Sequence, residues 1–367
     1  MRHERDAFYR RRRLIAAGGE LLPYVQHNHN EETLMPMIRK LTALAVALGA
    51  LCAAPPLLAK DAPSIVTVVK ITGENWFTRM NEGVVAYGRD NPGVTTSEIG
   101  PAKADAAQQG HLIEDLIAKN VSAIAVVPMD PSATEGVLKR AMDRGIKVVT
   151  HEGDSVKNTQ VDIEAFNNTA LGAHFNEQLA QCMGKSGKWT TFVGSLGSRT
   201  HVQWADGSAE NAKKYPQMQL VSPKNESFDD ANTAYEKARE ILRKYPDIKG
   251  IQGSAGNDVI GIGRAVEEAG LSGKVCVIGI GLPKDTSKYL ESGTVQSISF
   301  WDPKDAGYIM NKVAQMLLEG KQVTDGMDLG VPGYNKVSVK KGPGKGIIVT
   351  GQAWVDVNKS NYRQYPF

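Results

Sequence analysis

The stretch that decides the fold is IVTVVKITGENWFTRMNEG, residues 65–83. Its first five residues, Ile65–Val69, form a β-branched run that predicts a buried strand. A short break follows, and the residues after it alternate between polar and apolar with helical spacing. Trp76 and Phe77 lie at this strand-to-helix junction, close in sequence to Lys70. Ligands of open α/β sheets bind beyond the carboxyl ends of the strands. The junction therefore predicts one wall of a pocket for a small polar molecule with apolar faces.

Strands and helices alternate along the rest of the chain. The predicted strands are 65–70, 123–127, 146–150, 188–193, 219–222, 248–253, 274–280 and 295–300. The predicted helices are 75–90, 105–119, 134–144, 170–183, 201–214, 229–245, 257–269, 285–292 and 303–320. This alternation predicts two similar α/β domains with parallel, doubly wound sheets. The Gly- and Lys-rich segment from Val331 onward is expected to add strands to the second domain.

The net charge of +3 comes from the first part of the chain. Residues 1–59 hold eight of the 43 lysines and arginines and five of the 40 acidic residues, which leaves residues 60–367 with 35 of each. A protein that binds nucleic acid through phosphate contacts needs an excess of positive charge. The composition therefore argues against a nucleic-acid partner.

The N-terminal region has the features of a secretory signal peptide. Residues 35–59 combine the basic pair Arg39-Lys40 with an uncharged apolar run and end in a small residue, Ala59. The run is too short for a membrane anchor, and the leucine before Cys52 fits a lipoprotein signal poorly. We expect translation to start at Met35 or Met37, so that residues 1–34 are an upstream extension. The alternative is an unusually long, basic leader.

The exported part of the chain keeps two cysteines, Cys182 and Cys276. Export makes a disulfide chemically possible. Cys276 lies in an apolar predicted strand, however, which favours a buried free thiol. Their spacing does not suit a zinc or redox site, and we expect no metal.

Three segments carry the motifs of a known family: GSAGNDVIGIGRAVEEAG (253–270), KVCVIGIG (274–281) and YLESGTVQSISFWDPKDAGYIMNKVAQMLLEGK (289–321). Together with the signal peptide and the opening stretch, they resemble the periplasmic sugar-binding proteins of ABC importers. The chain is most similar to the branch with rhamnose- and autoinducer-2-binding proteins, whose ends also resemble Tyr365-Pro366-Phe367. Some of its motifs are shared with the ribose-binding branch.

This resemblance implies the fold of a type I periplasmic binding protein, with two Rossmann-like lobes joined by three hinge strands. The implied lobes are 63–165 plus 283–321, and 166–282 plus 322–367. The family binds a small sugar between the lobes, closes by hinge motion and delivers the sugar to an ABC transporter permease in the inner membrane. For this chain the resemblance implies a monomeric periplasmic protein that binds a pentose, a deoxyhexose or a related polyol. It implies neither enzymatic activity nor a cofactor.

The resemblance also implies ligand-binding residues in the first lobe. Lys70 matches a ligand-binding lysine, although a solvated lysine at a strand end is the alternative. Trp76 and Phe77 match an aromatic pair that covers the C–H face of a sugar, the alternative being lobe core. Glu152 stands where the family usually has an aspartate, and Asp154 matches a second acid. Carboxylates suit sugar sites because hydrogen bonds to charged groups contribute about 1.5–3 kcal/mol each.

The second lobe contributes candidates in two loops that follow strands. In the loop at 197–204, Thr200 and His201 replace an Asp-Gln pair of the autoinducer-2 branch, which argues against that ligand. Trp204 suits either the pocket or the helix core. Asn257 and Asp258 match the ribose-like branch, where the aspartate binds sugar hydroxyls, although an asparagine here also suits a helix cap. The full set of predicted ligand-binding residues is Lys70, Asn75, Trp76, Phe77, Glu152, Asp154, Arg199, Thr200, His201, Ser254, Gly256, Asn257, Asp258 and Trp301.

Other classes of function have weaker support in the sequence. A dinucleotide-binding enzyme would explain Gly279-Ile280-Gly281, but the third glycine and a clean helix start are missing. A transcription regulator of similar fold would need a DNA-binding head, and residues 1–62 hold a signal peptide instead. The remaining alternatives are a receptor for autoinducer-2 or another non-sugar molecule, and a ligand-binding partner of a chemoreceptor.

Overall fold

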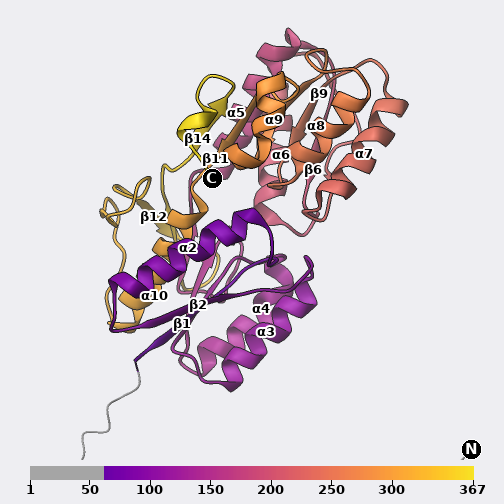
Figure 1. The fold of residues 1–367 in the computed structure, drawn as a ribbon. Coiled ribbons are helices and arrows are strands. Elements are labelled where there is room, and N and C mark those ends of the chain that lie inside the picture. The colour runs from indigo at the N-terminus through magenta and orange to yellow at the C-terminus, as the bar shows by residue number, and fades with distance from the viewer. Residues whose placement is uncertain (1–61) are drawn as a thin grey trace, which may run out of the picture. The chain divides into compact units, whose positions relative to one another are not determined.

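The computed structural model describes residues 62–367, which form two β-sheets with helices on both faces (Figure 1). The predicted upstream extension (1–34) and signal peptide (35–59) lie outside the described residues. No helix within 62–367 has the length and hydropathy needed to cross a bilayer.

The first sheet has seven strands, all parallel except the edge strand β12. Their spatial order is β12 (Ser338–Lys341), β13 (Ile347–Thr350), β5 (Val161–Glu164), β4 (Lys147–His151), β3 (Ala123–Val126), β1 (Ser64–Val68) and β2 (Thr95–Ile99). Two pairs of helices pack on it: α2 (Asn75–Asp90) with α10 (Pro303–Leu318), and α3 (Ala106–Ala118) with α4 (Pro131–Asp143).

The second sheet repeats this arrangement. Its path runs β14 (Val355–Asn358), β11 (Ser297–Phe300), β10 (Cys276–Ile280), β9 (Ile248–Gly253), β6 (Ser186–Val193) and β7 (Gln217–Leu220), and β8 (Asn225–Glu226) pairs with the end of β6. Its helices are α5 (Asn168–Met183), α6 (Arg199–Ala212), α7 (Ala231–Lys244), α8 (Asp258–Glu268) and α9 (Pro283–Ser292), with a short 3₁₀ turn, η1 (Tyr362–Gln364). Only β14 runs antiparallel to its neighbour on this path.

Local sequence explains where several helices begin. Asp105, Asp130, Asn167, Asp230 and Asp302 each precede a helix and accept a hydrogen bond from a backbone N–H of its first turn. Such a bond satisfies a donor that the helix itself leaves unpaired. These caps fix the strand-to-helix loops, and the candidate site is built from loops of this kind.

Every helix predicted from the sequence is present, but three strands were missed: β2, β5 and the two-residue strand β8. β2 is a polar edge strand, TTSEI, whose residues are exposed or half-buried, so it lacks an apolar run. β5 is fully buried yet carries two acids in the sequence VDIE. Neither pattern resembles the continuous β-branched run of a typical parallel strand.

The chain crosses between the sheets three times, at 165–167, 301–302 and 351–354. The first crossing agrees with the predicted lobe boundary, but the other two differ from it. α9 packs on α8, and β11 pairs with β10, so residues 283–300 belong with the second sheet rather than the first. β12 and β13 belong to the first sheet, where β13 pairs with β5, and not to the second sheet as predicted. The chain crosses to the second sheet only after β13, and β14 is its last strand there. The helix α10 does lie on the first sheet as predicted.

Cys182 and Cys276 form a disulfide, which corrects the expectation of a free thiol. The bond joins α5 to the first residue of β10 within the second lobe. The apolar surroundings of Cys276 were a correct inference, since the residue is 7% exposed. Burial alone does not separate a thiol from a disulfide, because both are apolar.

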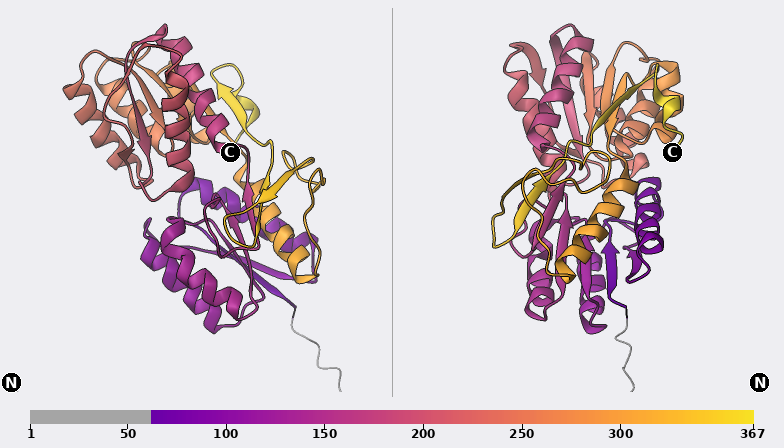
Figure 2. Two further views of the ribbon diagram at one scale, coloured as in Figure 1. Left: turned by 180° about the vertical axis from the view of Figure 1, so that it is seen from behind. Right: turned by 90° about the vertical axis from the view of Figure 1, so that its left-hand side faces the viewer.

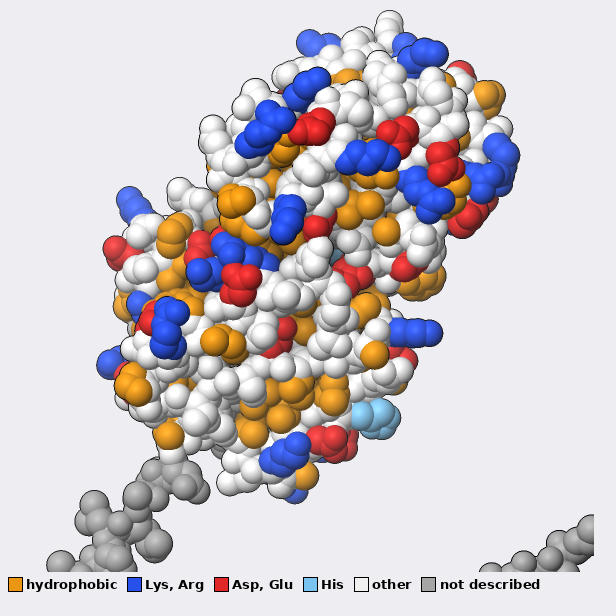
Figure 3. Space-filling view, viewed as in Figure 1, with side chains coloured by type: hydrophobic (Ala, Val, Ile, Leu, Met, Phe, Trp, Pro, Cys, Tyr) orange, Lys and Arg blue, Asp and Glu red, His pale blue; other side chains and the backbone are white. Residues whose placement is uncertain are grey.

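Further views show the two sheets with their helices from behind and from the side (Figure 2). In the space-filling view, Lys and Arg side chains are interspersed with Asp and Glu side chains over the face shown (Figure 3). No broad basic field covers this face, which agrees with the balanced charge of residues 60–367.

Candidate ligand-binding site

The carboxyl ends of strands from both sheets surround one small cavity. It is lined by Lys70, Glu74, Trp76, Phe77, Glu152, His201, Trp204, Asp229, Ser254, Gly256, Ile280 and Trp301. Eight of these residues were predicted to bind ligand: Lys70, Trp76, Phe77, Glu152, His201, Ser254, Gly256 and Trp301. Its volume of about 30 Å³ holds only water-sized molecules. The side chains themselves therefore fill most of the space between the strand ends.

A buried ion pair forms the first wall. The Lys70 ammonium group contacts the Glu152 carboxylate, and the two residues are only 3% and 6% exposed. Lys70 is therefore not the solvated strand-end lysine of the alternative interpretation. Burial opposes the ionisation of Glu152, but the charge and hydrogen bond of Lys70 act against burial, and the pKa of the carboxyl group is lowered.

Glu152 also has an unusual backbone conformation. Its φ of 60° lies in the left-handed region, which non-glycine residues seldom occupy. Such strained residues cluster at ligand sites, where the surrounding structure holds them in place. Here the strain points the carboxylate of Glu152 at Lys70, directly after β4.

Two histidines have tautomers fixed by their hydrogen bonds. The Gly194 N–H donates to Nδ1 of His201 (3.0 Å), so a neutral His201 carries its hydrogen on Nε2. Burial and the nearby Lys70 ammonium lower the pKa of His201 to about 3. His201 thus offers a donor from Nε2, which has no hydrogen-bond partner within residues 62–367. His151 lies behind the cavity, where its Nδ1 pairs with the Ile163 carbonyl (2.7 Å).

Four aromatic rings from three segments of the chain converge on the cavity: Trp76 and Phe77 are neighbours on α2, Trp204 lies on α6 and Trp301 follows β11. Trp301 is the centre of this group: its ring centroid lies 4.7 Å from Trp76 and 5.9 Å from Trp204, with edge-to-face geometry in both pairs. The Trp301 indole N–H donates to Nε2 of His151 (3.3 Å), which fixes its orientation. Phe77 completes the set. Such rings cover apolar C–H groups of a ligand and exclude water. Trp204 lines the cavity and is also 1% exposed, so it serves both pocket and core.

The opposite wall presents two polar groups that lack partners. The Asp229 Oδ2 atom and the Ser254 hydroxyl are buried and accept or donate no hydrogen bond within the described residues. Burying such groups without a partner costs free energy, so a ligand that supplies the missing bonds is favoured. Gly194 makes room for Asp229, since a Cβ at this position would lie 2.5 Å from its carboxylate.

Asp229 lies in a second strained loop. Phe228 and Asp229 both have left-handed φ values, 55° and 56°, and the Phe228 side chain is 52% exposed. Burial and the nearby Glu152 carboxylate raise the pKa of Asp229, although Lys70 acts in the opposite direction. The chain thus places a desolvated carboxyl group at the cavity although burial disfavours its charge.

Asn257 and Asp258 do not line the cavity, although both were predicted to bind the ligand. The Asp258 Oδ2 atom accepts hydrogen bonds from the backbone N–H groups of Ser254 and Ala255, both 2.8 Å long. Asn257 donates from Nδ2 to the Asp229 carbonyl (3.1 Å) rather than capping α8. Both residues therefore shape the loops that carry Ser254 and Asp229.

Four other predicted residues lie around the cavity without lining it. Asp154 accepts hydrogen bonds from Arg199 Nε (3.0 Å) and Gln203 Nε2 (2.6 Å), which links the loop after β4 to α6. Asn75 is exposed and donates from Nδ2 to Asp285 (2.8 Å). Thr200 is buried, with its hydroxyl 3.5 Å from Glu152 Oε2, at the outer limit of a hydrogen bond.

Sequence reasoning missed three lining residues: Glu74, Asp229 and Ile280. Glu74 directly precedes α2, and Ile280 ends β10, so both follow the strand-end rule that found the others. Asp229 was assigned to a helix, and no pattern in the sequence marks its left-handed loop. Burial and the carboxylates of Asp229 and Asp230 raise the pKa of Glu74 to about 8.

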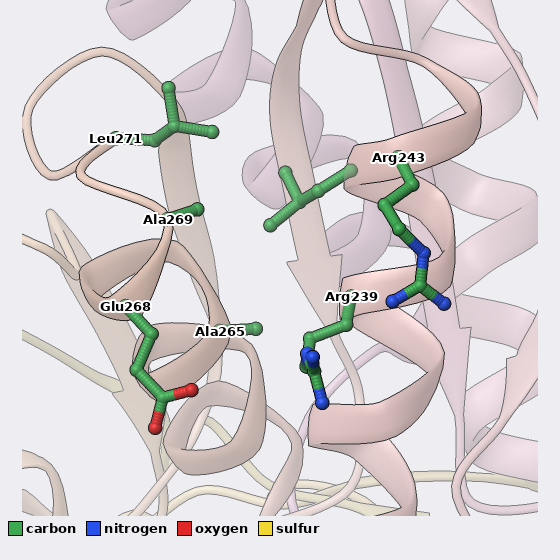
Figure 4. Close-up of a pocket in the computed structure, with 7 residues that line it drawn as sticks. Arg239, Arg243, Ala265, Glu268, Ala269 and Leu271 are labelled. Carbon is green, nitrogen blue, oxygen red and sulfur yellow. The ribbon is translucent and has the colours of Figure 1, made fainter.

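A larger groove of about 340 Å³ lies between α7 and α8 on the second lobe (Figure 4). Arg239, Arg243 and Glu268 stand at its sides, and Leu242, Ala265, Ala269 and Leu271 complete its lining. Its polar side chains are exposed, and Glu268 is already paired with Arg264. The groove lacks the buried, unpartnered polar groups of the strand-end cavity. Within residues 62–367, no cluster of three or more His, Cys, Asp or Glu side chains could hold a metal ion.

Comparisons with known proteins agree with this geometry. Residues 65–322 match the family described as periplasmic binding protein domain. The chain belongs to this family. It is 29% identical over 216 residues to the D-allose-binding periplasmic protein of Escherichia coli strain K12, covering 56% of this chain and 69% of that protein.

Solved structures show the same fold. An ABC transporter solute-binding protein from Clostridium phytofermentas with bound L-rhamnose has a TM-score of 0.76 and 21% identity, covering 83% of this chain and 98% of that one. LsrB from Clostridium saccharobutylicum in complex with AI-2 has a TM-score of 0.75 and 22% identity, covering 83% of this chain and all of the other. The predicted two-lobed periplasmic binding fold is confirmed.

Proposed function

We propose that this protein captures a small neutral sugar, such as a pentose, a deoxyhexose or a related polyol, between its two lobes. It delivers the sugar to the permease of an ABC transporter in the inner membrane, as a monomer exported to the periplasm. The protein carries out no chemistry on its ligand. Family membership and the D-allose-binding relative support the class of ligand and the transport role.

The single observation that carries the proposal is the composition of the strand-end cavity. Four aromatic rings face a set of hydrogen-bonding groups that includes the unpartnered Asp229 Oδ2 and Ser254 hydroxyl. A sugar has apolar C–H faces and a rim of hydroxyl groups, each of which both donates and accepts. Carboxylates accept from those hydroxyls, and Lys70 and His201 donate to them.

The small volume of the cavity implies that the ligand enters an opened form. At about 30 Å³ the cavity has no room for a sugar ring while Lys70 contacts Glu152. We expect the two lobes to open about the three crossings and the ion pair to separate around the ligand. Sugar hydroxyl groups then replace the contact between the two charged side chains, so neither charge is left buried without a partner.

A thermal-shift screen tests the class of ligand. Neutral pentoses, hexoses, deoxyhexoses and polyols, with D-allose and L-rhamnose among them, are compared with amino acids, nucleosides and AI-2. A ligand that binds only the folded state raises the midpoint of unfolding in proportion to its concentration and affinity. At least one neutral sugar or polyol is expected to raise the midpoint. Stabilisation by amino acids or nucleosides alone would show that the ligand class is wrong.

Replacing Asp229 by Asn is expected to weaken sugar binding. The change removes a buried charged acceptor, which is worth about 1.5–3 kcal/mol, or roughly a ten- to hundredfold rise in Kd. Burial raises the pKa of Asp229, so the folded state disfavours its charge. Removing that charge should therefore not lower the stability of the ligand-free protein at neutral pH. Calorimetric titration with the most stabilising sugar measures the affinity, and urea unfolding measures the stability.

The matched control is Asp206→Asn on the same lobe. Asp206 is 59% exposed on α6 and pairs with Lys224, outside the cavity. Its replacement should leave the affinity within about twofold of the wild type, since exposed ion pairs contribute little. Equal affinity in Asp229→Asn and Asp206→Asn would remove Asp229 from the binding site.

A further inference from the structure

Two buried carboxyl groups stand side by side on β5, next to the first crossing between the lobes. Asp162 and Glu164 are two residues apart, so their side chains share one face of the strand. They are 2% and 4% exposed and lie within hydrogen-bond reach of each other. Neither forms an ion pair within the described residues, and neither lines the strand-end cavity.

Asp162 accepts more hydrogen bonds from other residues than Glu164 does. Asp162 Oδ1 accepts from the Thr150 hydroxyl (2.7 Å) and from the Gly153 N–H (3.0 Å). Glu164 Oε2 accepts only from Asn168 Nδ2 (2.8 Å). The other oxygen of each group, Asp162 Oδ2 and Glu164 Oε1, has no donor within residues 62–367. Two orphaned carboxyl oxygens on neighbouring acids of one strand face are explained if one carboxyl group carries a proton and donates it to the other.

The charges that face this pair are negative. Asp154, after β4, is the nearest further carboxylate and is itself held by Arg199 and Gln203. Tyr334 faces Glu164 with a buried hydroxyl that makes no hydrogen bond in the described part of the chain. His151 lies on the neighbouring strand β4, where burial lowers its pKa and favours the neutral ring. With no cation against the pair, two adjacent carboxylates would be costly.

The pair is connected to the ligand cavity by a short chain of hydrogen bonds. Asn168 Nδ2 donates to Glu164, while Asn168 Oδ1 accepts from the Trp204 indole N–H (2.8 Å). Trp204 lines the cavity and packs against His201 and Trp301. Asn168 is the first residue of α5, so this chain joins the first sheet to the second lobe.

We propose that Glu164 is protonated at neutral pH and donates to Asp162, and that this one-proton pair positions Trp204 through Asn168. Glu164 is the donor because Asp162 already accepts two other hydrogen bonds, which favour its charged form. Burial raises the pKa of both groups, and that of Glu164 further because the Asp162 charge repels its ionisation. Loss of the proton at alkaline pH places a second charge beside Asn168 and changes the environment of the Trp204 indole.

Tryptophan fluorescence between pH 6 and pH 10 tests the proposal without any ligand. Glu74 lines the same cavity as Trp204 and has a pKa of about 8, so every protein in this test carries Glu74→Gln to remove its titration. The emission of this reference protein should follow a one-proton transition on the alkaline side, while far-UV circular dichroism stays constant. Trp204→Phe should lose this transition, which assigns the signal to Trp204. Glu164→Gln should also lose it and stay folded, because its amide donates to Asp162 and its carbonyl accepts from Asn168.

Glu98→Gln is the matched control. Glu98 lies on the edge strand β2, and burial raises its pKa to about 8, but it has no connection to Trp204. Its replacement should leave the fluorescence transition in place. A constant emission in the Glu74→Gln reference protein, or a transition that persists when Glu164→Gln is added to it, would overturn the proposal. The emission test uses no ligand, so its failure is distinct from failure of the proposed sugar binding.

Discussion

Replacing Lys70 by Met is expected to lower the free energy of unfolding by about 3–5 kcal/mol at neutral pH. The change leaves the Glu152 carboxylate buried without its positive partner, and both side chains of the wild-type pair are almost inaccessible to solvent. The double variant Lys70→Met/Glu152→Gln should recover most of the loss, because it contains no unpaired buried charge. Urea unfolding of the wild type, both single variants and the double variant measures the coupling energy.

The loss of stability caused by Lys70→Met should depend on pH in one direction. The folded pKa of Glu152 is lowered, so its pair with Lys70 stabilises the protein above the unfolded pKa of glutamate, about 4.3. This stabilisation is lost as the pH falls through the folded pKa. The difference between wild type and Lys70→Met should therefore shrink in acid. A Lys70→Met protein within about 1 kcal/mol of the wild type at neutral pH would show that the ion pair is not buried as described.

Removing the disulfide is expected to cost about 2–5 kcal/mol of stability. Cys182 and Cys276 are 94 residues apart, so their bond closes a long loop in the unfolded chain. The cost should appear as a lower midpoint of urea unfolding, both in the reduced wild type and in Cys182→Ala/Cys276→Ala. Reducing agent should not change that variant further. Equal midpoints for the oxidised and reduced wild type would contradict a disulfide within the second lobe.

Much of the fold follows from local sequence patterns. The β-branched run of β1 and the helical spacing of α2 predict a strand and a helix, and the structure contains them at Ser64–Val68 and Asn75–Asp90. The third crossing could not be predicted in this way. β13 and β14 are short strands of similar composition, and only their pairing partners, β5 and β11, assign them to different sheets.

The residues of the candidate site likewise fall into those that a sequence rule predicts and those that only the structure reveals. Glu152 and Trp301 directly follow parallel strands, Lys70 lies two residues after one, and the rule that ligands bind at strand ends finds all three. Asp229 follows a two-residue strand and owes its position to a left-handed backbone, which the sequence does not encode in a recognisable motif. By sequence, Asp258 is compatible with either a ligand contact or a role in shaping its loop. Its hydrogen bonds from the Ser254 and Ala255 N–H groups favour the loop-shaping role.

A crystal structure with the sugar that stabilises the protein most tests the central claim most directly. We predict one sugar ring between the aromatic group of Trp76 and Trp301 and the second-lobe wall, with hydroxyl groups bonded to Asp229 and Ser254. The ion pair between Lys70 and Glu152 should be opened by the ligand. A sugar bound elsewhere, such as in the groove between α7 and α8, with the strand-end cavity unchanged, would contradict the account.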